Sequence, residues 1–253
     1  MKRICVLIMV AVFAGHASAI SLSDVKDAIK SNTGASSGGT SASSGAGVSS
    51  LSNAETSDGL KAALDQGVTK AVSMLGATDG FFGNKEVKIP LPKSLQKIEK
   101  GMKLMGMGKQ SDELVLKMNR AAEAAVPEAK ALLVDSIKKM TLADAKAILT
   151  GPQDAATQYF KRTTSTQMAE KFLPIVEKAT ANVQLAESYN KYAEMGSKFG
   201  VVKKEDANIN QYVTRKALDG LYLMIAKEEA AIRKDPLGQA SSIIKKVFGA
   251  VGK

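Results

Sequence analysis

The sequence predicts an all-α protein built as an irregular multi-helix bundle of about eight helices. From Leu51 onward, apolar residues recur three and four positions apart, which is the spacing of one face of an α-helix. Proline and glycine interrupt this pattern at intervals that leave helix-length segments. Strand-like alternation occurs only between Phe81 and Leu91, where we expect at most a short two-stranded ribbon.

The first element, residues 1–19, has the pattern of a signal peptide. Lys2 and Arg3 precede an apolar run of residues 4–14, and the small-residue sequence at 17–19 suits a cleavage site after Ala19. The apolar run is too short to span a bilayer, which takes about 20 helical residues. We therefore expect export to the periplasm, with secretion as the second choice.

Export would also remove the chemistry of two residue types. Cys5 and His16 are the only cysteine and histidine, and both lie in the predicted leader. A mature chain without them has no Ser-His-Asp or Cys-His catalytic group and lacks the usual ligands of zinc. We expect no cofactor and no metal, whereas chemistry based on carboxylates stays open.

Two short segments precede the predicted helical domain, residues 51–253. Residues 20–30 predict a short amphipathic helix, because apolar residues stand at i, i+3 and i+7. Residues 31–50 consist almost entirely of Ser, Gly, Ala and Thr, a composition typical of a flexible linker. The short helix is either a tethered docking motif or a frayed end of the mature chain.

Start and stop signals divide the helical domain. Ser52 and Glu55 form a capping box before the first long helix, and Thr141 and Asp144 form another. Pro127 must kink or divide the helix that contains it. The first predicted helix follows the capping box at Ser52 and ends at Leu75. The other predicted helices cover residues 94–105, 111–140, 142–150, 153–161, 165–195, 207–234 and 239–251.

Polar residues flank an apolar helical face in the segment 114–126. Asn119 and Glu123 are four positions apart, and Arg120 can pair with Glu123 at i, i+3. Polar groups at the edge of a packed face need partners, so they either tie helices together or line a ligand cleft.

A second candidate group lies in the helix 207–234. Apolar residues surround Asp219 on nearly every side, which predicts a buried carboxylate. Because a buried charge needs a partner, we expect Arg215 to pair with Asp219, with Tyr212 and Tyr222 nearby. Such a group is either a structural network or a binding or acid-base site.

A third candidate group begins the helix at 153–161. Asp154 stands at a helix start, where the helix dipole favours an acid, and Tyr159 and Arg162 follow within two turns. This mixture suits the rim of a ligand site, and it equally suits a helix end packed against its neighbour.

Charge suggests the kind of partner. The formal net charge is +10 at pH 7, which either favours an anionic envelope component or only keeps the protein in solution. An envelope protein and an apolar envelope component stay open as partners, and nucleic acid is not expected outside the cytoplasm. Residues 243–251 place apolar and Lys side chains on opposite faces, which is typical of a helix on a membrane surface. The same face could instead dock on the bundle.

Five segments together carry a family resemblance. They resemble the bacterial family catalogued as domain of unknown function four-one-nine-seven, over most of residues 51–249. The resemblance implies a signal-bearing, helical, extracytoplasmic protein, without an activity or a ligand. The segments are KIPLP at 88–92, MNRAAEAAVPEAK at 118–130, DAATQYF at 154–160, FLPIVEKA at 172–179 and YVTRKALDGLYLMIAKEEAAIRKDP at 212–236.

Three functions remain open from the sequence. The first is a cofactor-free binding or adaptor protein of the bacterial envelope. The second is a carrier that encloses an apolar ligand, such as a lipid or quinone, within the bundle. The third is a carboxylate-based hydrolase that uses Glu123, Asp154 or Asp219.

Overall fold

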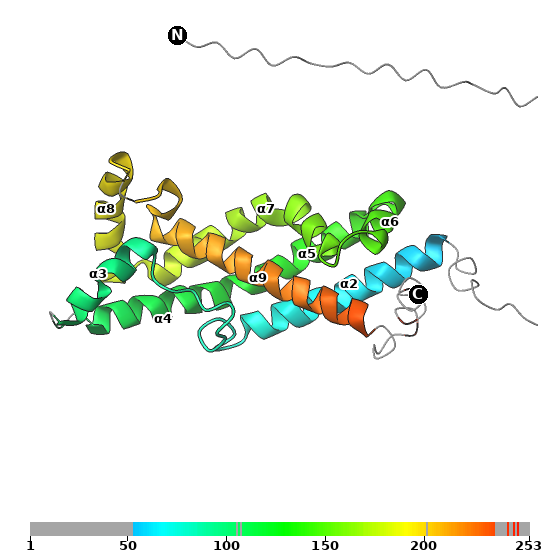
Figure 1. Ribbon diagram of the computed structural model, residues 1–253, viewed down its shortest axis with the longest axis horizontal. Coiled ribbons are helices and arrows are strands. Elements are labelled where there is room, and N and C mark those ends of the chain that lie inside the picture. Colours follow the sequence, from blue (N-terminus) through cyan, green and yellow to red (C-terminus); the bar gives the residue numbers. More distant parts are fainter. Residues whose placement is uncertain are drawn as a thin grey trace, which may run out of the picture. The chain divides into compact units, whose positions relative to one another are not determined.

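The computed structural model describes residues 53–104, 106, 108–200 and 202–235, together with Ser242, Lys245 and Val247. These residues form an all-α unit, which confirms the predicted fold class, and none of them lies in a strand (Figure 1). The predicted leader, the segment 20–30, the linker 31–50 and Ser52 lie outside the described residues. The helices are α2 (Asn53–Gly76), α3 (Lys93–Leu104), α4 (Gly108–Ala125), α5 (Ala129–Lys139), α6 (Leu142–Thr150), α7 (Ala155–Thr180), α8 (Gln184–Lys198) and α9 (Ile209–Lys234), with short 3-10 helices η1 (Val126–Glu128) and η2 (Lys204–Asp206).

The helices α7 and α9 pack along each other in opposite directions and form the centre of this unit (Figure 1). Backbone amides at the start of α7 bond to Glu229 near the end of α9, and Thr180 at the end of α7 bonds to Asn210 at the start of α9. The helices α2, α4 and α5 pack around this pair. Fully buried Phe160 and Phe172 of α7 lie in the resulting core.

The helix α7 is continuous where the sequence predicts two helices, so the predicted break between residues 161 and 165 is wrong. Thr163, Thr164 and Ser165 lie at this predicted break. Their hydroxyls donate to the carbonyls of residues 159, 160 and 161 within α7, at 2.9, 2.6 and 2.5 Å. Such a back-bond lets Ser and Thr occupy a helix interior. The actual break follows Thr180, and Pro174 stays inside α7.

Two predicted boundaries are confirmed. The helix α4 ends before Pro127, which lies in η1, so the proline divides the predicted long helix. At α6, the Thr141 hydroxyl accepts the Asp144 amide and the Asp144 carboxylate accepts the Thr141 amide, each at 3.1 Å. These hydrogen bonds from Thr141 hold the pKa of Asp144 below its usual value.

The predicted ribbon at residues 81–91 is wrong, because turns and irregular backbone occupy this segment. It nevertheless packs tightly, with Phe81 and Ile89 almost fully buried. It lies against α9 at Gly220, where a Cβ atom would come within 2.8 Å of the Phe81 ring. A glycine at this position therefore lets the segment approach the helix closely.

Residues 239–251 were predicted to form a last helix, and most of them lie outside the described residues. Ser242, Lys245 and Val247 are helical, and Val247 is only 1% exposed. Within the described part of the chain, every helix is too short or too polar to cross a bilayer.

Candidate functional site

Asn119 on α4 binds the backbone of the irregular segment that precedes α3. Its Oδ1 accepts the Ile89 N–H at 2.8 Å, and its Nδ2 donates to the carbonyl oxygens of Ile89 and Val115 at 2.9 and 2.8 Å. Asn119 is fully buried, and both ends of its amide are used. The side chain therefore replaces the strand partner that the segment lacks.

Glu123 lies one turn further along α4 and binds the same segment. Its Oε1 accepts the N–H groups of Phe81 and Phe82, each at 3.0 Å. The predicted pair with Arg120 is confirmed, with 2.6 Å between Arg120 Nη1 and Glu123 Oε2. That bond, and a second one to Asp79, raise the pKa of Arg120. We call Asn119 and Glu123 the tie cluster, since both join α4 to residues 81–89.

Asp154 does not cap α7 with its side chain. Its carboxylate accepts from Gln158 Nε2 at 3.0 Å on the surface. The carboxylate that binds the first backbone amides of α7 belongs to Glu229 of α9. Its oxygens accept the N–H groups of Ala156 and Thr157 and the Thr157 hydroxyl, each at 3.0 Å. Sequence reasoning missed Glu229, because its spacing from Arg233 resembles an ordinary surface ion pair.

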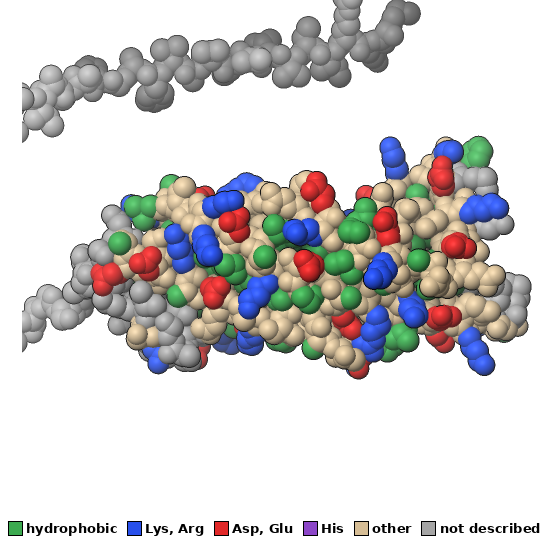
Figure 2. All heavy atoms as spheres, turned by 180° about the vertical axis from the view of Figure 1, so that it is seen from behind, with side chains coloured by type: hydrophobic (Ala, Val, Ile, Leu, Met, Phe, Trp, Pro, Cys, Tyr) green, Lys and Arg blue, Asp and Glu red, His purple; other side chains and the backbone are tan. Residues whose placement is uncertain are grey.

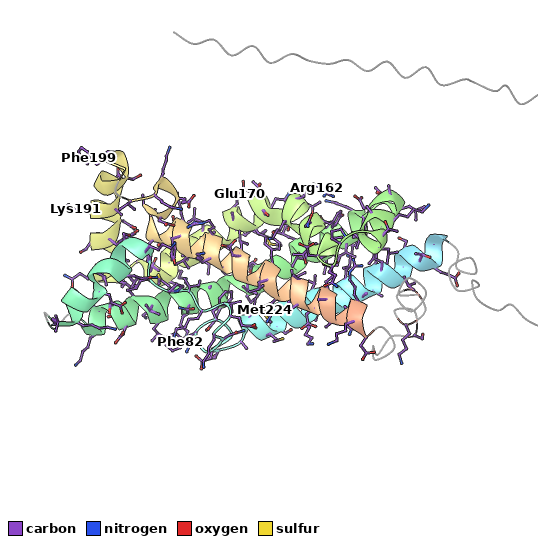
Figure 3. All side chains as sticks on the ribbon, viewed as in Figure 1. Phe82, Arg162, Glu170, Lys191, Phe199 and Met224 are labelled. Carbon is purple, nitrogen blue, oxygen red and sulfur yellow. The ribbon has the colours of Figure 1, made fainter. Side chains whose placement is uncertain are left out.

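Tyr159 and Arg162 lie together as expected, in a cleft of about 350 Å³ formed by α5, α6 and α7. The buried Tyr159 hydroxyl donates to the Ser136 carbonyl at 2.9 Å. Arg162 stacks over the Tyr159 ring at 5.5 Å and comes within 3.7 Å of Asp144. Its guanidinium is largely solvent-exposed, and α7 carries it outward (Figure 3). Nothing in this cleft needs a ligand to complete its polar contacts.

The predicted pair of Arg215 and Asp219 is wrong. Asp219 is exposed and lies 3.7 Å from Lys216, whereas Arg215 Nη2 binds Asp206 Oδ1 of η2. The prediction failed because Asp219 is exposed and lines an open cleft, where a carboxylate needs no buried partner. Asp206 is only 15% exposed, so its own desolvation favours the arginine.

Arg215 and Tyr212 form a stacked pair at the start of α9. The Arg215 guanidinium lies 5.5 Å from the centre of the Tyr212 ring. The Tyr212 hydroxyl donates to the Pro90 carbonyl at 3.0 Å. Burial, reinforced by nearby Asp206, raises the pKa of Tyr212 to about 12. The phenol is therefore a neutral hydrogen-bond donor at physiological pH.

A polar cleft of about 450 Å³ opens beside this pair. Three of its carboxylates pair with lysines: Glu86 with Lys227, Glu205 with Lys203 and Asp219 with Lys216. We call this space the polar cleft. Its charged and aromatic lining consists of Glu86, Lys88, Lys93, Lys203, Glu205, Asp206, Tyr212, Arg215, Lys216 and Asp219.

A groove of about 460 Å³ runs between α7 and α9. Its floor is mainly apolar, from Ala169, Leu173 and Leu218, and Arg215 lines both this groove and the polar cleft. We call it the apolar groove. Its lining residues are Ser165, Thr166, Ala169, Glu170, Leu173, Gln211, Thr214, Arg215 and Leu218.

Two buried side-chain atoms in the described part of the chain make no hydrogen bond, and they belong to adjacent residues. They are Oγ1 of Thr214 and Nη1 of Arg215. Both residues line the apolar groove. An unpaired buried polar group is costly, which makes such atoms good indicators of a missing partner. Both atoms are themselves buried, so a ligand in the groove would reach them only after these side chains turn toward it.

The carboxylates named as catalytic candidates do not meet in a shared cleft. Asp219 lines the polar cleft, whereas neither Glu123 nor Asp154 lines the polar cleft, the apolar groove or the cleft beside Tyr159. Glu123 is occupied by two backbone amides and Arg120. Within the described residues, no group of three or more His, Cys, Asp or Glu side chains could hold a metal ion.

Comparison with known proteins gives one match. The model of the family described as "Protein of unknown function (DUF4197)" matches residues 50–249, so the chain belongs to this family. No curated protein and no solved structure matches the chain.

Proposed function

We propose that this member of the DUF4197 family is an exported binding protein whose ligand is an amphiphile with an anionic head and an apolar tail. The ligand would lie in the apolar groove between α7 and α9. The observation that carries the proposal is the pair of unpaired buried atoms, Thr214 Oγ1 and Arg215 Nη1, at this groove. The proposal keeps the predicted carrier role but moves the ligand from the interior of the bundle to its surface.

The head group is assigned from the donors. Arginine binds carboxylate and phosphate with two parallel N–H bonds, and Arg215 has its Nη2 bound to Asp206 and its Nη1 unpaired. Stacking on Tyr212 limits the orientations of the guanidinium. The Arg215 side chain is 35% exposed, which leaves it room to turn Nη1 toward a ligand oxygen. The same oxygen could accept the Thr214 hydroxyl proton.

The tail is assigned from the groove floor. Ala169 and Leu173 are partly buried, and Leu218 is 8% exposed, so they offer a shallow apolar strip. The groove volume of about 460 Å³ falls in the range of small-molecule sites. An acyl chain in this strip would gain roughly 25 cal/mol for each Å² of apolar surface removed from water.

A fluorescent long-chain fatty acid and its methyl ester test this proposal, since they share a tail and differ in charge. We expect the acid to bind the purified chain more tightly than the ester. Arg215→Gln should remove this preference, with a loss of acid affinity of about 10-fold or more. Lys216→Gln is the matched control, because Lys216 is the next residue of α9 and lines only the polar cleft.

Tail binding is tested separately. Leu173→Gln should weaken both probes, whereas Leu223→Gln, in the polar cleft, should weaken neither. Thermal unfolding of each variant separates lost binding from lost folding. The proposal is wrong if the acid and the ester bind equally, or if Arg215→Gln binds the acid like the unchanged chain while remaining folded.

Export has its own measurement. The signal pattern at residues 1–19 supports a periplasmic location. Cell fractionation should place the chain in the periplasm, and N-terminal sequencing should begin at Ile20. A cytoplasmic chain that retains Met1 would contradict this part of the proposal.

A further inference from the structure

The turn that follows α8 exposes a large aromatic side chain. Phe199 is 83% exposed, and within the described residues only Leu104 is a more exposed large hydrophobic side chain. Phe199 lies directly beyond the end of α8, the helix that carries Lys191 (Figure 3). We call residues 198–200 and 202–204 the α8 tip.

The α8 tip holds Phe199 outward through a closed turn. Gly200 has φ of 73°, a left-handed conformation that glycine adopts without strain, and its N–H donates to the Ser197 carbonyl at 3.1 Å. Val202 then folds back, with its N–H bonded to the Gly196 carbonyl at 3.2 Å. A Cβ atom at Gly196 would lie 2.9 Å from Val202 Cγ2. The apolar neighbour Val202 thus packs inward, and Phe199 does not.

Exposed lysines are frequent on α8 and in the turn that follows it. Lys191, Lys198, Lys203 and Lys204 are all exposed. Glu187, Glu194 and Glu205 are the exposed acids of the same segment, and Glu194 lies 3.2 Å from Lys198 and Glu205 3.6 Å from Lys203. Asp206 adds no free charge at the tip, because it binds Arg215. In Figure 2 this end of the unit, at upper right, carries hydrophobic atoms beside Lys or Arg side chains.

We propose that the α8 tip docks on an anionic lipid surface. Phe199 would enter the interfacial region, and the lysines would face lipid phosphates, to which each basic residue is attracted. A protein partner fits less well, since lysine is depleted at protein interfaces and their centres need a contiguous apolar area. This contact differs from the one expected at residues 243–251, and it does not depend on the ligand proposed for the apolar groove.

Vesicle co-sedimentation of the purified full chain provides the test. We expect binding to phosphatidylglycerol-rich vesicles, weak binding to phosphatidylcholine vesicles, and release by salt. Lys203→Gln with Lys204→Gln should lower the partition coefficient about 10-fold. Lys138→Gln with Lys146→Gln removes the same charge from α5 and α6 and should lower it far less.

The aromatic side chain has a matched control as well. Phe199→Ser should lower the partition coefficient about 10-fold, and Leu104→Ser, at the end of α3, should leave it nearly unchanged. Both sites are exposed, so neither variant should unfold the chain. Loss of binding with Leu104→Ser but not with Phe199→Ser would place the contact on α3 and overturn the proposal.

Two further results separate the occupants. If the unchanged chain does not bind anionic vesicles, or if it forms a dimer in light scattering that Phe199→Ser dissociates, then the tip is not a lipid contact. Leu173→Gln, which tests the apolar groove, should bind vesicles like the unchanged chain. Failure of the groove proposal therefore leaves the tip result intact, and the reverse also holds.

Discussion

The tie cluster on α4 and the start of α9 both place buried polar side chains on a packed helix, but they differ in completeness. Asn119 and Glu123 use every oxygen and nitrogen of their side chains in hydrogen bonds. Thr214 and Arg215 each leave one buried atom unpaired. A fully hydrogen-bonded network is accounted for by its role in holding the fold together. An incompletely bonded network beside a groove points to a partner outside the chain.

The largest expected effect tests the complete side of this comparison. Glu123→Ala should lower the free energy of unfolding by about 3 kcal/mol, because it leaves two amides and Arg120 without their acceptor. Urea unfolding measures the loss. Asp219→Ala is the control and should change stability by less than about 0.5 kcal/mol, since Asp219 is exposed. Equal losses of unfolding free energy in the two variants would contradict the structural role of Glu123.

The second effect concerns the other member of the tie cluster. Asn119→Ala should cost about 2 kcal/mol, because the buried N–H and C=O of Ile89 lose their partner. Amide hydrogen exchange should show faster exchange at Ile89 than at α9 residues. A small loss with unchanged exchange at Ile89 would mean that the segment 81–89 is held by packing alone.

The third prediction compares two buried threonines directly. The Thr157 hydroxyl donates to Glu229, so Thr157→Val should cost about 1 kcal/mol. The Thr214 hydroxyl has no partner, so Thr214→Val should be neutral or stabilise the chain by up to about 1 kcal/mol. Thermal unfolding of both variants decides this. A loss of stability in Thr214→Val would show that its hydroxyl is already satisfied.

The smallest effect is a pH dependence at Tyr212. Its pKa of about 12 lies above the ordinary value of 10.0, so the folded state favours the neutral phenol. Its stabilising contribution is therefore full below about pH 10 and falls as the pH rises from there toward 12. Tyr212→Phe should flatten this fall in unfolding experiments. Absorbance titration should show one fewer late-ionising tyrosine, and an unchanged titration would contradict the assignment.

The sequence predicted interactions between residues that are close together along the chain. The pair of Arg120 and Glu123 and the capping box at Thr141 depend only on helix geometry over three residues, and both are confirmed. The all-α class follows equally from local periodicity. The family resemblance is confirmed by the match over residues 50–249.

The failures involve partners far apart in sequence or choices between two local alternatives. The acceptor at the start of α7 is Glu229, more than seventy residues away, which no local pattern reveals. Arg215 pairs with Asp206 of η2 and not with Asp219, although Asp219 has the spacing of an ion pair within a helix. Likewise, the hydroxyls at 163–165 could cap a helix or bond back within one, and only the surrounding packing decides. Of the α9 residues now proposed to take part in binding, the sequence indicated Tyr212 and Arg215 but not Thr214.

Pro174 gives the apolar groove one wall that differs from the other in backbone hydrogen bonding. It lies inside α7 beside Leu173, and proline lacks the N–H that would bond the carbonyl of Glu170. The helix therefore lacks one internal hydrogen bond alongside the groove, whereas α9 contains no proline opposite it. Local opening should be more frequent in this turn of α7, on the microsecond or slower time scale of helix fluctuations. The rate at which a bulky tail enters the groove would then depend on local opening of α7, while α9 keeps its conformation.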